Sequence, residues 1–177
     1  MKKLLPPILT LLIAAGLLLG MRFGLRAPAE RAEAAERQQT MKLLLPGSST
    51  FTEEAYSGED ENVKAVYQGE TGYVIETVTE GYVGPIKLWV GVDQKGAVTG
   101  VMVRDMEESF GLGRRATTDP AFLRAFLGTK GDLTVGENVD AITGATVSSK
   151  AITKGVNSAS AFVTGADVSS GATTWGG

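Results

Sequence analysis

The chain of 177 residues contains no cysteine and no histidine. Without thiols and imidazoles it cannot form disulfides, bind zinc or an iron–sulfur cluster through the usual ligands, or use a serine–histidine pair in catalysis. We therefore expect no metal site and no catalytic residue in this chain. Any redox chemistry has to come from a bound cofactor.

Basic residues are scarce outside the N-terminal segment. The first 26 residues contain Lys2, Lys3, Arg22 and Arg26 and no acidic residue, whereas the rest of the chain has 13 basic and 20 acidic residues. An acidic domain without a basic stripe argues against nucleic acid as a partner.

Only one long hydrophobic run is present. Residues 4–21 carry no charge and follow Lys2 and Lys3. At about 1.5 Å per residue, a helix of this length nearly spans a hydrocarbon core of about 30 Å. We predict a transmembrane helix within residues 1–26, with its N-terminus in the cytoplasm. A cleaved signal peptide is the alternative, because Ala27, Pro28 and Ala29 form an A-x-A pattern.

The segments around the main domain differ in composition. Residues 27–47 are rich in helix-forming residues and end at Pro46 and Gly47, which predicts a juxtamembrane helix that acts as a solvated spacer. The main domain is expected at residues 48–165, beginning with a polar loop that has one helical turn near residues 52–56. Residues 166–177 form a tail of small residues.

Four β-branched or aromatic runs predict an antiparallel meander. They are residues 63–67, 72–78, 86–92 and 98–103, with a hairpin turn at residues 93–96 where Gly96 supplies a positive φ. We expect Trp89 to belong to the core rather than to contact a cofactor.

Two helices are expected to pack on this sheet. The first has Asp119 as N-cap, Pro120 at its first position and Gly128 as C-cap, with an apolar face of Phe122, Leu123, Phe126 and Leu127. The second spans residues 147–163, with Ile152, Val156, Ala159 and Val163 on one face. The predicted fold class is therefore α+β.

A segment of small residues and hydroxyls precedes the second helix. In residues 140–150, DAITGATVSSK, Thr146 follows Gly144 and Ala145, so another molecule can approach it closely. The start of a helix also favours an anion, through its free N–H groups and the helix dipole. Thr146 is a candidate attachment point for a phosphate-bearing cofactor; the alternative is a turn into a helix capped by Thr146.

The same segment resembles the flavinylation motif of the FMN-binding domain family, an acidic residue followed by Thr/Ser-Gly-Ala-Thr. Residues 81–87 and 108–113 resemble two further segments of that family, in the same order. The resemblance implies that Thr146 carries FMN through a phosphoester made by a flavin transferase of the ApbE type, with Asp140 as a recognition residue. It implies cofactor contacts at Thr143, Gly144, Ala145, Ser149, Tyr82, Gly84, Ile86, Glu108, Gly111, Leu112 and Gly113.

Within that family the chain resembles the G subunits of the Rnf ion-translocating ferredoxin:NAD oxidoreductase complex, which are related to the C subunits of sodium-pumping NADH:quinone reductase. This resemblance implies a single-pass protein of the cytoplasmic membrane with an extracytoplasmic FMN domain. Such a domain relays electrons between other membrane subunits and is not an enzyme alone. A stand-alone FMN carrier for another reductase and a non-redox binding module are the alternatives.

Two features depart from the family pattern. Ser109 and Phe110 replace its Thr-Pro, so that Phe110 is either an aromatic neighbour of the flavin ring or a packing residue. Residues 167–173 repeat the acid-x-x-hydroxyl-Gly-Ala-Thr pattern, which makes Thr173 a second candidate. We predict flavin on Thr146 and not on Thr173.

Overall fold

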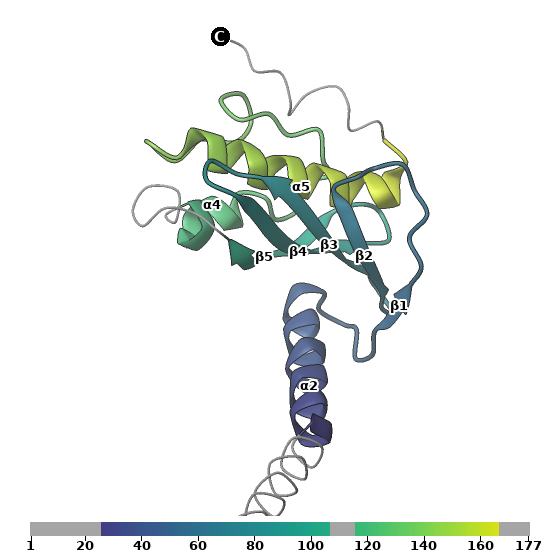
Figure 1. Cartoon of the computed structure of the whole chain (residues 1–177). Coiled ribbons are helices and arrows are strands. Elements are labelled where there is room, and N and C mark those ends of the chain that lie inside the picture. The colour runs from purple at the N-terminus through teal and green to yellow at the C-terminus, as the bar shows by residue number, and fades with distance from the viewer. Residues whose placement is uncertain (1–25, 107–115, 167–177) are drawn as a thin grey trace, which may run out of the picture. The chain divides into compact units, whose positions relative to one another are not determined.

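The structure is a computed structural model that describes residues 26–106 and 116–166, with side chains from residue 32 onward (Figure 1). The chain divides into two compact units, residues 1–39 and 40–177. None of the helices within the described ranges combines the length and the hydrophobicity that a membrane span needs. The predicted span at residues 4–21 lies outside those ranges.

The first described helix, α2 (Arg26–Leu44), confirms the helix predicted before Pro46. Residues 32–37 are exposed, as expected of a solvated spacer. The end of the helix differs, because Met41, Leu44 and Leu45 are buried. The expectation of a purely solvated helix is therefore wrong for these residues, which bury their side chains against the sheet.

The sheet is antiparallel and its strands lie in sequence order. The strands are β1 (Thr52–Glu54), β2 (Val63–Gln68), β3 (Gly72–Glu80), β4 (Pro85–Asp93) and β5 (Val98–Met106). The four predicted strands are confirmed, and the expected turn at residues 93–96 is closed by a bond from the Gly96 N–H to the Asp93 carbonyl, 3.0 Å, with Gly96 at φ +80°.

Strand β1 corrects the prediction of a helical turn near residues 52–56. All three of its residues are exposed and none is apolar. It is a strand because it pairs with β2, with Thr52 opposite Gln68. Such a strand lacks the apolar alternation by which a half-buried strand is recognised in a sequence.

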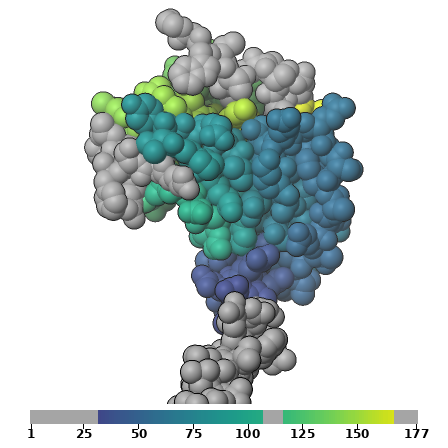
Figure 2. Space-filling view, in the orientation of Figure 1, coloured from purple at the N-terminus to yellow at the C-terminus, as the bar shows by residue number. Residues whose placement is uncertain are grey.

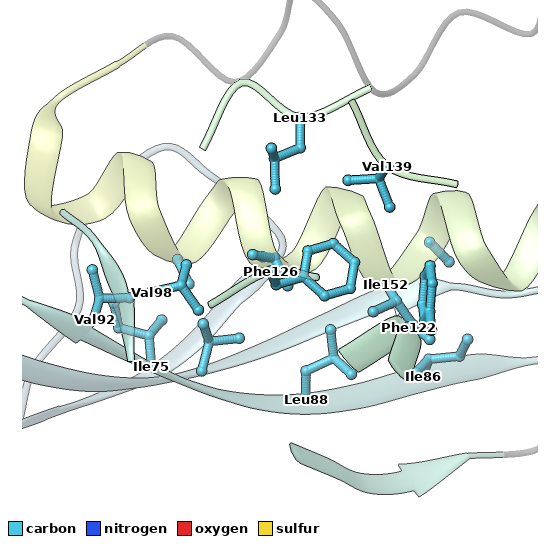
Figure 3. Close-up of a cluster of buried hydrophobic side chains, with 14 of the residues drawn as sticks. Ile75, Ile86, Leu88, Val92, Val98, Phe122, Phe126, Leu133, Val139 and Ile152 are labelled. Carbon is cyan, nitrogen blue, oxygen red and sulfur yellow. The ribbon is translucent and has the colours of Figure 1, made fainter. Parts of the chain in front are cut away.

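One face of the sheet is covered by α5 (Thr146–Thr164), the helix predicted at residues 147–163. Ile152, Val156 and Ala159 are fully buried there. Figure 3 shows Ile75, Ile86 and Leu88 of the strands pointing toward this helix. A Cβ atom at Gly155 would lie 2.7 Å from Leu88 Cδ1, so this glycine lets the helix approach the sheet closely. Figure 2 accordingly shows α5 only as a yellow and green rim above the strands.

The opposite face carries a second, smaller core. Its buried residues are Met41, Leu44, Leu45, Phe51, Tyr67, Val74 and Trp89. The backbone of Leu44 lies over Gly91, where a Cβ atom would come within 2.1 Å of the Leu44 oxygen, and that oxygen accepts a 2.5 Å bond from Thr99 Oγ1. Trp89 belongs to this core, as predicted, and its indole N–H donates to Glu76 at 2.8 Å.

The helix predicted at residues 119–128 is shorter than expected. Asp119 is its N-cap, as predicted, but α4 (Pro120–Arg124) ends with Ala125 as C-cap rather than Gly128. The chain turns because the Gly128 N–H donates to the Val98 carbonyl and the Val98 N–H donates to the Thr129 carbonyl, both at 2.8 Å. Phe122 and Phe126 are buried, whereas Leu127 is 46% exposed and was wrongly assigned to the buried face.

Candidate functional site

Thr146 is the first residue of α5 and its side chain is exposed. Its hydroxyl has no hydrogen-bond partner within the described parts of the chain. The N-cap is Ala145, which makes no side-chain capping bond. The interpretation of Thr146 as a helix cap is therefore wrong, and the hydroxyl is not used by the local fold.

Among the residues that the structure describes, no side chain caps the start of α5. The first N–H groups of an α-helix have no partner within the helix and need a side chain, water or a ligand. Together with the helix dipole, these groups favour an anion close to Thr146. The helix start therefore suits a phosphate ester on this hydroxyl.

A tight turn leads into the helix. The Ala145 N–H donates to the Ile142 carbonyl at 2.8 Å, and Gly144 between them has φ +79°. Glycine adopts this conformation without the steric cost that a Cβ atom brings. Thr143 and Gly144 are exposed at the turn, as is Asp140 just before it.

Ser149 lies beneath this turn and is fully buried. Its Oγ accepts a 3.2 Å bond from the Ile142 N–H. Its own N–H donates to the Ala145 carbonyl at 2.8 Å. Although the sequence suggests a cofactor contact at Ser149, its acceptor role in the structure is within the fold.

The neighbouring Ser148 is 1% exposed, and its Oγ has no partner among the described residues. A buried hydroxyl without a hydrogen bond costs about 1–3 kcal/mol, so such groups are rare and call for an explanation. This orphaned hydroxyl lies two residues from Thr146. The family resemblance implied a role for Ser149 and none for Ser148, and the residue types alone do not show which of two adjacent serines faces the site.

The hairpin between β3 and β4 lies at the same end of the sheet. Thr79, near the end of β3, donates its hydroxyl to the Ala151 carbonyl in the second turn of α5, at 2.9 Å. The Gly81 N–H closes the hairpin on the Gly84 carbonyl at 2.9 Å, and Tyr82 at its tip is 74% exposed. Ile86 is fully buried, so its side chain belongs to the core.

The other predicted site residues lie outside the described residues. These are Glu108, Phe110, Gly111, Leu112, Gly113 and Thr173. Within the described ranges, no cluster of acidic side chains is arranged to hold a metal ion.

An antiparallel sheet, backed by a helix that starts after a glycine turn with a threonine hydroxyl unbonded among the described residues, defines a domain suited to a phosphate-bearing cofactor. Residues 81–161 match the family model of the FMN-binding domain. Thr146 and the hairpin at residues 81–84 both fall within the matched region.

Relatives along most of the chain agree with this match. The chain is 31% identical over 159 residues to the G subunit of the proton-translocating ferredoxin:NAD(+) oxidoreductase complex of Clostridium ljungdahlii, covering 85% of this chain and 84% of the relative. It is 32% identical over 169 residues to the G subunit of the ion-translocating oxidoreductase complex of Methanosarcina acetivorans, covering 85% and 87%. It is also 33% identical over 111 residues to the G subunit of the Na(+)-translocating ferredoxin:NAD(+) oxidoreductase complex of Acetobacterium woodii. This match covers 55% of this chain and 54% of the relative. The chain belongs to the family of FMN-binding domain proteins that includes these G subunits.

Proposed function

We propose that this protein is a membrane-anchored flavoprotein subunit that carries FMN covalently on Thr146. In this role it relays electrons within an Rnf-type ion-translocating complex, between ferredoxin and NAD. The observation that carries the proposal is the exposed Thr146 hydroxyl, without a partner in the described residues, at the uncapped start of α5. The names of the related G subunits support the place in an electron-transfer complex.

The residues around Thr146 fit a flavin phosphate. The Thr146 oxygen would form the ester, and the free N–H groups of the first helical turn would face its negative charge. The buried Ser148 hydroxyl, which has no partner among the described residues, is a further unused donor in the same first turn of α5. Bound FMN would supply one-electron redox chemistry, and the protein would orient it and limit its contact with water.

The membrane anchor and the partners complete the proposal. Residues 1–26 hold the protein in the cytoplasmic membrane as a single pass, residues 27–47 lead away from the bilayer, and residues 48–165 form the extracytoplasmic FMN domain before the tail at 166–177. The partners are the other membrane subunits of the complex and, for maturation, a flavin transferase of the ApbE type that recognises Asp140.

Intact-mass spectrometry of the full chain, co-expressed with such a transferase, tests this proposal. We expect one covalent FMN on the wild type and on Thr173→Ala, and none on Thr146→Ala. Because the Thr146 hydroxyl makes no bond within the described residues, Thr146→Ala should change stability by less than about 0.5 kcal/mol. Loss of the flavin in a variant whose thermal unfolding matches that of flavin-free wild type would exclude misfolding as the cause.

Several results would contradict the proposal. Flavin retained by Thr146→Ala, or lost in Thr173→Ala, would move the attachment site. A wild-type protein without flavin in a host that contains the transferase would favour a non-redox module. Purification without other membrane subunits would favour a stand-alone carrier.

A further inference from the structure

Ser149 occupies a position in which its side chain holds two parts of the chain together. It lies in the first turn of α5, fully buried, three residues after Thr146. Its hydroxyl oxygen accepts the N–H of Ile142, seven residues earlier, at 3.2 Å. The bond is part-buried, and a backbone N–H shielded from water is costly to leave unpaired, so this bond favours the observed turn.

The bond closes a ring of three hydrogen bonds. The Ile142 N–H donates to Ser149 Oγ, the Ser149 N–H donates to the Ala145 carbonyl at 2.8 Å, and the Ala145 N–H donates to the Ile142 carbonyl at 2.8 Å. Two of these bonds join backbone groups and form with any side chain. The third depends on the Ser149 hydroxyl, so the ring can be opened by changing one oxygen atom.

The ring is important because no side chain caps the N-terminus of α5 within the described part of the chain. Ala145 provides no capping bond, and Thr146 contributes none from its exposed hydroxyl. The first turn of a helix without caps is prone to fray. The ring fixes the turn at residues 142–145 on α5, between Asp140 and Thr146, which are both exposed.

We infer that Ser149 is a positioning residue for flavin attachment. It holds the turn at residues 142–145 on α5, so that the Thr146 hydroxyl and the Asp140 carboxylate are presented to the transferase in one fixed arrangement. This inference rests on the proposed attachment of FMN to Thr146.

The attachment step itself needs an activated flavin phosphate, because an alcohol does not condense with a free phosphate monoester in water without an energy source. Flavin adenine dinucleotide supplies it as a pyrophosphate. The Thr146 oxygen bonds to the flavin phosphorus, the pyrophosphate P–O bond breaks, adenosine monophosphate leaves, and the hydroxyl proton passes to a base of the transferase or to water. Ser149 forms and breaks no covalent bond.

A pair of variants separates the hydroxyl from the shape of the side chain. Ser149→Thr keeps an oxygen acceptor and adds a methyl group, whereas Ser149→Val matches that threonine in size and lacks the oxygen. The full-length chain in detergent is treated with purified transferase and flavin adenine dinucleotide, and the initial rate of flavin incorporation is measured at increasing acceptor concentrations. We expect Ser149→Thr to stay near the wild-type rate.

Ser149→Val should load at least about tenfold more slowly, because a shift of about 1 Å in a reacting group can cost about 100-fold in rate. The matched controls are Ser160→Thr and Ser160→Val. Ser160 is also fully buried on α5 and donates its hydroxyl to the Gly96 carbonyl at 2.7 Å, in a different part of the helix. The two Ser160 variants should load at equal rates. Loss of the Ser160 hydrogen bond lowers the stability of the domain but does not change the geometry of the turn before Thr146.

Loading of Ser149→Val as fast as Ser149→Thr, or faster, would overturn the positioning role. The same holds if the Ser160 pair shows an equal difference, because the effect would then be one of stability. Should Ser149→Val fail to fold by near-ultraviolet circular dichroism, Ser149→Ala against Ser160→Ala gives the same comparison without added volume. A wild type that takes no flavin would instead overturn the proposed function.

Discussion

The two ends of α5 differ in how their polar groups are used. At the C-terminal end, Gly165 has φ +68° and its N–H donates to the Ala161 carbonyl at 2.7 Å. Ser160 donates to the Gly96 carbonyl, and Thr164 donates to the Ser160 carbonyl. At the N-terminal end, Thr146 and Ser148 have no such partners among the described residues, and the N-cap is an alanine.

Both ends contain serine and threonine, so composition does not distinguish them. At the C-terminal end, the hydroxyls of Ser160 and Thr164 form hydrogen bonds within the fold. At the N-terminal end, the hydroxyls of Thr146 and Ser148 have no partner among the described residues. A buried polar group without a partner, such as the Ser148 hydroxyl, reduces stability, and proteins commonly keep such groups where a ligand binds. We call the C-terminal end of α5 the closed end and its N-terminal end the open end. Substitutions near the closed end should therefore change the stability of the fold, and those at the open end should change the attachment or binding of the flavin.

The largest effect on stability is expected from Asn157→Ala. The Asn157 side chain accepts the Leu133 N–H at 3.1 Å and donates to the Leu133 carbonyl at 2.9 Å, in a buried setting. Its removal leaves two buried backbone groups unpaired and should lower the free energy of unfolding by about 2 kcal/mol or more. Denaturant unfolding of the full chain measures this loss.

Lys154→Ala, on the same helix, is the control for Asn157→Ala and should stay within about 0.5 kcal/mol of the wild type. Equal stability of the two variants would show that the hydrogen bonds between the Asn157 side chain and the Leu133 backbone do not stabilise the fold. Flavin loading of both folded variants should match the wild type.

An intermediate effect is expected from one substitution made at both ends. Ser160→Ala removes a bond to the Gly96 carbonyl and should cost about 1 kcal/mol. Ser148→Ala removes a buried hydroxyl that has no partner within the described residues, so it should be neutral or slightly stabilising in flavin-free protein. Thermal unfolding of both variants, with and without flavin, checks the pair.

With flavin attached, Ser148→Ala should lose part of the stabilisation that the wild type gains from loading, whereas Ser160→Ala should keep it. Equal destabilisation of the two flavin-free variants would contradict the claim that the Ser160 hydroxyl stabilises the fold and the Ser148 hydroxyl does not.

The smallest effect concerns acid stability in a region away from α5. Hydrogen bonds from its own backbone and from the Ser49 hydroxyl and N–H lower the pKa of the Glu70 carboxyl from 4.5 to about 2. Because the folded pKa is depressed, this group contributes stability above pH 4.5, and the contribution is lost as the pH falls toward 2. In acid unfolding, Glu70→Gln should therefore lose less stability than the wild type as the pH falls from 4.5 toward 2. An unchanged profile would show that these bonds do not affect stability.

Much of the fold could be predicted from residue patterns. The β-branched runs predicted β2 to β5, and the apolar spacing of Ile152, Val156 and Ala159 predicted α5. Strand β1 was missed because its three exposed residues depend on pairing with β2. The buried end of α2 was missed because its docking over Gly91 is a contact between distant segments.

The site was predicted less evenly. The sequence placed Thr146 at the start of a helix, and the structure confirms that position. It gave Ser149 as a cofactor contact and did not mark Ser148, because the roles of the two serines follow from the helix phase and from the turn at residues 142–145. Hydrogen-bond partners seven residues apart depend on the turn geometry, which the residue types alone do not specify.

The most direct test of flavin attachment at the open end of α5 is to locate the flavin within the loaded wild-type chain by tandem mass spectrometry. Trypsin cleaves after Lys130, Lys150 and Lys154, which separates residues 131–150, with Thr146, from residues 155–177, with Thr173. We predict one flavin phosphate on the first peptide, with fragment ions that assign it to Thr146. Flavin on the second peptide, or on Thr143 or Ser148 of the first, would contradict this assignment.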